Sequence, residues 1–191
     1  ILGDVLSELS WRRLREQAGV TYGAYAYVQN RVNGDAVMTI AGLFQNDATE
    51  FALKTMMDLI NEGTTGDLDD SIIKNAKWST ARTTVLGQQS SSQMMGFLSS
   101  ALEYRGEDYI KNMPNILAGV SKADLVSAIA PCQGHETITI VGPTEYTEPA
   151  LKALQASGME IPYEVIDWKQ SYLDLLSEKE RKKHFKAEAK A

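Results

Sequence analysis

Cysteine and histidine are scarce in this sequence of 191 residues. Cys132 is the sole cysteine, which excludes a disulfide within the chain, and His135 and His184 are the only histidines. No apolar run approaches the roughly 18 residues of a membrane-spanning helix, so we expect no membrane span. Acidic residues outnumber basic ones, 25 against 19, which gives a net charge of −6. A chain of this sign lacks a broad basic face, so we expect no nucleic-acid partner.

The chain also lacks a recognisable catalytic constellation. A catalytic zinc needs about three protein ligands, and Cys132 and His135 make only one Cys-x-x-His pair, with His184 far away in a charged tail. The serines at 90–92 have no Gly-x-Ser-x-Gly frame, and no Gly-rich loop is suited to phosphate. We therefore predict no catalytic residue, metal site or cofactor in this chain.

Hydrophobic residues make up 43% of the chain and charged residues 23%, as in ordinary globular proteins. Apolar spacing predicts a helix ending at Gly19, a left-handed cap, and then a hairpin. Asp47 and Asp67 are the expected N-caps of the two helices that follow it. The expected helices span 2–17, 47–63, 67–86, 90–104, 108–117, 121–131 and a segment from about 149 to 158, and the expected strands span 22–29, 36–44 and 136–141, with a turn at 33–35.

This pattern predicts one α+β domain over residues 1–170 and a charged helical tail over 171–191. Residues 177–191 hold six Lys or Arg against three Glu, a local net charge of +3. A solvated terminal helix is the simpler interpretation, and contact with an acidic partner or lipid headgroups is the alternative. Helical spacing begins at Leu2 with no capping residue ahead of it, so we expect the chain to be a piece of a longer one.

The segment from Trp11 to Tyr22 stands out. Arg15 falls in the last turn of the first helix, and Tyr22 follows seven residues later at the start of a strand. A helix–Gly–strand reversal at Gly19 brings these two side chains back towards each other. In a purely structural interpretation, Arg15 complements the helix dipole and Tyr22 packs at the sheet edge.

The residues Leu14-Arg15-Glu16, Gly19 and Tyr22 closely resemble the Leu-Arg-Glu-x-x-Gly-x-x-Tyr signature of pitrilysin/insulinase-type (M16) zinc peptidases, in their second, zinc-free domain. The resemblance continues through the hairpin, the segment 102–109 and the strand ending at 140–142, and covers about residues 1–160. It implies a mostly antiparallel sheet with helices packed on it, of the LuxS/MPP-like kind, with the first strands missing.

The resemblance also implies a role. The inverted His-x-x-Glu-His zinc motif of the family's catalytic domain is absent here, so the chain is similar to the non-catalytic domain that faces it across a closed chamber. Arg15 and Tyr22 would then contact a peptide substrate near the scissile bond. The implied partners are a zinc-bearing domain, in the same parent chain or a separate subunit, and the peptide itself. An incomplete sheet would also favour homo-oligomers.

Two other functions remain open. M16-like domains also serve as catalytically silent scaffold subunits, and a zinc motif in the parent chain would decide against that role. An unrelated helical binding domain is the second alternative, and it predicts no helix-to-strand turn at Gly19.

Overall fold

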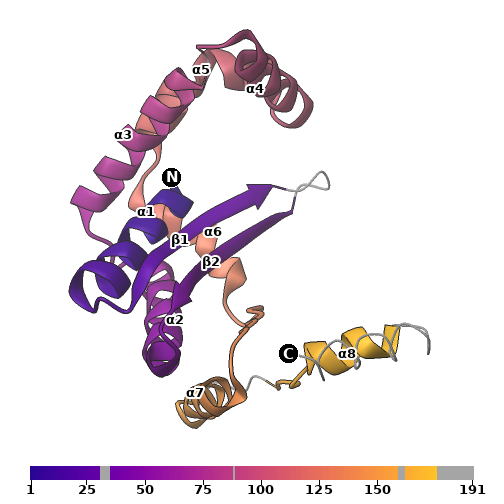
Figure 1. The fold of residues 1–191 in the computed structure, drawn as a ribbon. Helices are drawn as coiled ribbons and strands as arrows, with labels where there is room; N and C mark the ends of the chain where they lie inside the picture. The colour runs from indigo at the N-terminus through magenta and orange to yellow at the C-terminus, as the bar shows by residue number, and fades with distance from the viewer. Residues whose placement is uncertain (31–34, 88, 159–161, 176–191) are drawn as a thin grey trace. The chain divides into compact units, whose positions relative to one another are not determined.

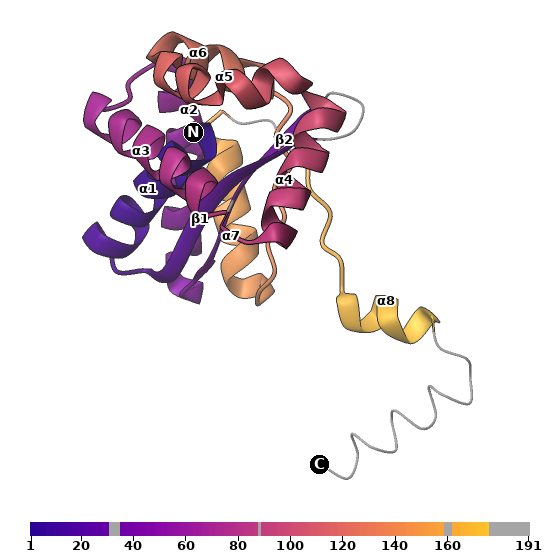
Figure 2. The same cartoon turned by 90° about the horizontal axis from the view of Figure 1, so that it is seen from above.

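The computed structural model describes residues 1–30, 35–87, 89–158 and 162–175. The chain divides into two units, Ile1–Ser157 and Gly158–Ala191, and each is described by itself. Figures 1 and 2 show that helices predominate and that the described strands form one hairpin. The first unit contains α1 (Leu2–Ser10), β1 (Thr21–Asn30), β2 (Ala36–Phe44), α2 (Thr49–Thr65), α3 (Asp70–Leu86), α4 (Ser91–Tyr104), α5 (Glu107–Gly119), α6 (Lys122–Ile129) and α7 (Thr144–Ala156).

The first helix ends where the sequence predicts, but its last turns are widened. After α1 the chain continues without a break as a π-helical segment, Trp11–Gln17, and Gly19 ends it at φ 67°. The predicted left-handed cap at Gly19 is therefore confirmed. The helix α1 packs against β1, and Gly3 permits the close approach, because a Cβ there would lie 3.1 Å from the Cα of Tyr27.

The hairpin confirms both predicted strands at 22–29 and 36–44. The strands β1 and β2 pair antiparallel, with Ala24 opposite Gly42, and the register is interrupted between Thr21 and Gly23. The predicted turn at 33–35 lies mostly outside the described residues, of which only Asp35 is one.

The core of the first unit lies between the hairpin, α1 and α2, and α6 and α7 also pack on α2. Its fully or almost fully buried side chains include Val5, Leu6, Leu14, Leu59, Ile72, Ile129 and Leu154. Burial of this apolar surface is the main force that fixes the helices on the hairpin.

Three predicted helix boundaries are wrong by a few residues. The helix α2 ends at Gly66, at φ 77°, and not at Gly63, which is buried inside it with Ile129 packed over its Cα. A 3₁₀ turn over Asn46–Ala48 precedes α2, so Asp47 caps nothing. The N-cap of α3 is Asp69, two residues beyond the prediction, and its carboxylate accepts a 2.7 Å hydrogen bond from the Ser71 amide.

The helices α4, α5 and α6 match the predictions more closely, whereas α7 begins at Thr144, five residues before the predicted start, so that Pro149 lies inside it. Ser90 caps α4, and Ser121 caps α6 in a capping box with Asp124. The predicted strand at 136–141 is not found, because the segment has no strand partner within the described residues. Part of that segment and β2 instead line a common cavity of about 450 Å³, with Met56 and Ile60 of α2 also in its wall.

The second unit contains one described helix, α8 (Trp168–Leu175). The predicted charged tail at 171–191 lies outside the described residues from position 176 onwards, as does His184. Across the described ranges, no helix is both long and apolar enough to cross a membrane.

Helix capping makes the stability of the first unit sensitive to acid. The hydrogen bonds from Ser71 lower the pKa of Asp69, and those from Ser121 lower the pKa of Asp124, in both cases from 3.8. A carboxyl group whose pKa is lowered by folding stabilises the fold at pH values above its ordinary pKa. This contribution is lost as the pH falls through the lower pKa of the folded state.

We therefore predict that Asp69→Asn reduces the loss of thermal stability between about pH 6 and about pH 3, because Asn caps nearly as well and does not titrate. Thermal unfolding midpoints at both pH values check this. Asp47→Asn, at a position that caps no helix, is the matched control. An unchanged acid response in Asp69→Asn would show that this cap contributes nothing to it.

Candidate functional site

The π-helical segment that precedes β1 carries three successive side chains, Arg13, Leu14 and Arg15, which point in different directions. Arg13 donates two 2.6 Å hydrogen bonds to Glu62 of α2, and this contact raises the pKa of Arg13. Leu14 is fully buried against Ala24 and Ala52. Arg15 is therefore the member of the trio that projects away from the core, on a segment that its two neighbours fix in place.

Tyr22 lies at an irregularity in β1. Thr21 pairs with Phe44 and Gly23 with Leu43, so Tyr22 is an extra residue with no partner across the hairpin. Such a bulge redirects a side chain and frees its backbone groups from the ladder. The Tyr22 side chain is 90% exposed as a result.

The structure brings Arg15 and Tyr22 together, as the seven-residue spacing predicts. The Arg15 guanidinium donates a 2.5 Å hydrogen bond to the Tyr22 carbonyl oxygen, and its Cζ lies 5.8 Å from the centroid of the Tyr22 ring. The half-buried guanidinium is therefore anchored at one nitrogen. Tyr22 presents its phenol beside the remaining donors.

Two further residues shape the site, and sequence reasoning missed both. The Cζ of Arg15 lies 4.6 Å from the ring centroid of Trp11, so the guanidinium contacts two aromatic rings. The i,i+4 spacing of Trp11 and Arg15 on a helix is the signal that could have found this contact. The second residue, Thr21, is buried, and its hydroxyl bonds to the carbonyl of Leu43 and accepts from the amide of Gly23 at 3.0 Å.

These contacts make Thr21 the residue that closes the bulge. We predict that Thr21→Val lowers the free energy of unfolding by about 1–3 kcal/mol, because the partly buried Gly23 amide then loses its acceptor. Urea unfolding measures the change. Thr21→Ser keeps the hydroxyl and serves as the control. Equal stability of the Val variant and the wild type would remove Thr21 from this role.

The site opens into a cavity of about 430 Å³. Its lining residues are Arg15, Gly19, Val20, Thr21, Tyr22, Leu43, Phe44 and Gln45. None of them is acidic, and Leu43 at its mouth is 85% exposed. The cavity therefore combines one cation with exposed apolar surface.

Cys132 and His135, the pair of metal-ligand residue types in the sequence, do not form a metal site in the described part of the chain. Cys132 and His135 lie close together, with the His135 amide donating to the Cys132 carbonyl at 3.1 Å, and both line the cavity beside β2. The described part of the chain contains no group of three His, Cys, Asp or Glu side chains able to hold a metal ion. The residues that are described therefore do not fit a catalytic zinc site.

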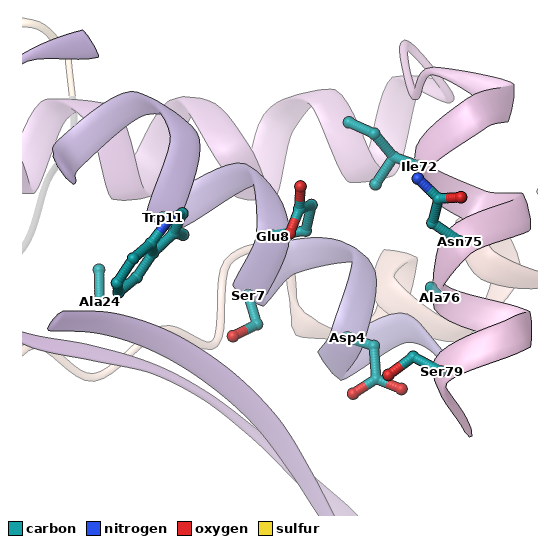
Figure 3. A pocket seen from close by; sticks show the side chains of 9 residues that line it. All are labelled: Asp4, Ser7, Glu8, Trp11, Ala24, Ile72, Asn75, Ala76 and Ser79. Carbon is teal, nitrogen blue, oxygen red and sulfur yellow. The ribbon is translucent and has the colours of Figure 1, made fainter. Parts of the chain in front are cut away.

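A second polar cavity, of about 480 Å³, lies between α1 and α3 (Figure 3). Trp11 and Ala24 lie at one end, and Asp4 and Ser79 at the other. Its acidic groups already have partners: Asp4 accepts a 2.6 Å hydrogen bond from Thr80, and Glu8 pairs with Arg12 at 2.8 Å. The two acidic side chains of this cavity are therefore occupied by contacts within the chain.

Comparison with known proteins gives matches by structure alone. No protein-family model and no curated protein matches the chain. A protease from Helicobacter pylori is similar with a TM-score of 0.56 at 18% identity, over 68% of this chain and 33% of that one. The peptidase M16 inactive domain from Pseudomonas fluorescens is similar with a TM-score of 0.57 at 16% identity, with the same coverage. The periplasmic protease PqqL from Escherichia coli is similar with a TM-score of 0.52 at 14% identity, over 67% of this chain and 14% of that one.

These likenesses establish the fold. The first unit is an α+β structure with the fold of M16 peptidase domains, among them one described as inactive, and the resemblance noted in the sequence is confirmed at this level. The chain spans a third or less of the length of these proteins. The helix-to-strand turn at Gly19 is present, contrary to the expectation for an unrelated helical binding domain.

Proposed function

We propose that this chain is the non-catalytic, substrate-contacting domain of an M16-type zinc endopeptidase, closing the proteolytic chamber opposite the zinc domain. The observation that carries the proposal is the Arg15 guanidinium, anchored on the Tyr22 carbonyl at a β-bulge beside an exposed phenol. Both groups are hydrogen-bond donors, and the Arg15 guanidinium is fixed in place by its bond to the Tyr22 carbonyl. Donors fixed in this way can stabilise negative charge developing on a substrate carbonyl without reorganising first.

The zinc belongs, in this proposal, to a partner domain in the same parent chain or a separate subunit. The fold supports such a partner, because it is shared with an M16 inactive domain. A silent scaffold subunit remains the alternative, and the exposure of Tyr22 counts against it. A scaffold has no need of an aromatic side chain that is 90% exposed beside an arginine that contacts two rings.

We also propose that the two described strands belong to a larger, mostly antiparallel sheet of the LuxS/MPP-like kind. Part of the segment 136–141 and β2 line a common cavity, and no backbone hydrogen bond joins them in the described part. Unpaired strand edges favour association, so the isolated chain is expected to form homo-oligomers.

Reconstitution tests the proposed function. The 191-residue chain alone should retain no stoichiometric zinc after dialysis and should cleave no peptide, while the zinc-bearing domain should need this chain for full cleavage. Sedimentation of the chain at micromolar concentration, with and without that domain, should show self-association replaced by a mixed complex. Chelator-sensitive cleavage by the chain alone, or full cleavage by the zinc-bearing domain without it, would overturn the proposal.

A further inference from the structure

Within the described part of the chain, Arg15 differs from its two neighbouring arginines in having no anionic partner. Arg12 pairs with Glu8 at 2.8 Å, and Arg13 pairs with Glu62 at 2.6 Å. Among the contacts of the described residues, Arg15 donates one hydrogen bond, to a neutral carbonyl, and otherwise contacts only the rings of Trp11 and Tyr22. Its fork of donors is held in place with most of its hydrogen-bonding capacity unused.

The cavity beside Arg15 complements this free charge with apolar surface. No acidic side chain of the described residues lines it. Leu43 pairs with Gly23 across the hairpin, one position from the bulged Tyr22, and these two large side chains are 85% and 90% exposed. A ligand that fits this surface carries a negative charge for the guanidinium and a large apolar group for Leu43 and the Tyr22 ring.

We propose that this cavity binds the C-terminal carboxylate of a peptide whose last side chain is large and apolar. The last residue of such a peptide carries both the carboxylate and the apolar side chain on a single Cα. This suits a site whose cation and apolar surface line one cavity of about 430 Å³. Hydrogen bonds between a guanidinium and a carboxylate are about twice as strong as neutral ones. The free carboxylate is therefore the feature that the site recognises.

This inference rests on the proposed function and extends it to the product. Hydrolysis adds the hydroxyl of water to the scissile carbonyl carbon, breaks the C–N bond and leaves the other proton on the departing amine. The new carboxylic acid then loses its proton to solvent near neutral pH. A neutral carbonyl beside Arg15 thus becomes a carboxylate, so the amino-terminal product is retained more tightly than the substrate and inhibits the next turnover.

Peptide binding to the 191-residue chain tests this without any catalysis. Calorimetry would compare a short peptide ending in Leu as the free acid, the same peptide amidated, and a free acid ending in Gly. We expect amidation to weaken binding at least about tenfold, and the Gly ending to weaken it by a smaller factor. Equal affinities for the acid and the amide would overturn the proposal, and so would equal affinities for the Leu and Gly endings.

Variants of the chain locate the site. Arg15→Gln should abolish the preference for the acid, and Leu43→Ala should reduce the preference for Leu while keeping that for the acid. Arg105 also stacks on an aromatic ring, with its Cζ 5.2 Å from the Tyr109 centroid, so Arg105→Gln is a matched control and should change neither preference. An acid preference that survives Arg15→Gln would contradict the assignment.

The two proposals fail separately. If the acid and the amide bind equally while Tyr22→Phe slows the assembled protease, only the carboxylate site is wrong. If the acid preference depends on Arg15 while Tyr22→Phe leaves turnover unchanged, the carboxylate site stands and the catalytic contribution of Tyr22 is wrong.

Discussion

Tyr22→Phe in the assembled, zinc-bearing protease is expected to lower turnover by roughly 10²–10³-fold, or about 2.7–4 kcal/mol of transition-state stabilisation. The substitution deletes one hydroxyl and keeps the ring that lies beside the Arg15 guanidinium. Because the Tyr22 side chain is 90% exposed, losing the hydroxyl leaves no buried group unsatisfied, and the fold should be unaffected. The measurement is kcat/KM per folded molecule, with the thermal midpoint recorded in parallel.

Tyr25→Phe is the matched control, since Tyr25 lies on the same strand, is 52% exposed and stacks on Tyr27. It should leave turnover unchanged. Arg15→Lys keeps the charge but loses the planar fork, so it should lower turnover in the same direction as Tyr22→Phe. Near-wild-type turnover in Tyr22→Phe would leave Tyr22 as a packing residue.

Leu14→Ala is expected to have the largest effect on stability, about 2–5 kcal/mol of the free energy of unfolding. Leu14 is fully buried in a cluster with Ala24 and Ala52, against which Phe44 and Met56 also pack. Truncating Leu14 leaves a cavity in this cluster. The small side chains of Ala24 and Ala52 cannot fill it unless the helix or the hairpin moves. Urea unfolding measures the loss.

The exposed Leu102→Ala serves as the control and should cost under about 0.5 kcal/mol, because Leu102 is 56% exposed. In the assembled protease, Leu14→Ala should reduce the amount of folded enzyme and move Arg15 only indirectly. A variant as stable as wild type would show that this cluster does not fix the helix on the hairpin.

The central features of the fold could be predicted from the sequence because they depend on local signals. Alternating apolar residues define β1 and β2, and Gly19 fixes the reversal that joins Arg15 to Tyr22. The helix caps were misplaced by two or three residues where several candidates stand close together. Near α3, Asp67 and Asp69 both suit a cap, and in the structure it is Asp69 that accepts the hydrogen bond from the Ser71 amide.

Other features depend on distant partners and leave no local signal. The bulge at Tyr22 results from a register between β1 and β2, and the role of Thr21 follows from that bulge. The pattern at 136–141 is typical of a strand, but a strand also needs a neighbour, and the described residues provide none. The wide turns after Ser10 were not predicted either, and they begin where the buried Ser10 hydroxyl donates a 2.7 Å hydrogen bond to the Leu6 carbonyl.

The direct test of a substrate-facing Arg15–Tyr22 pair is a structure of the zinc-bearing assembly with an uncleavable peptide in its chamber. The distance to measure runs from the Tyr22 hydroxyl and the Arg15 guanidinium to the carbonyl oxygen of the bond that would be cleaved. We predict that at least one of these donors lies within hydrogen-bond reach of it, about 2.6–3.2 Å. Both side chains facing solvent outside the chamber, with the peptide held by other residues, would contradict the proposed function.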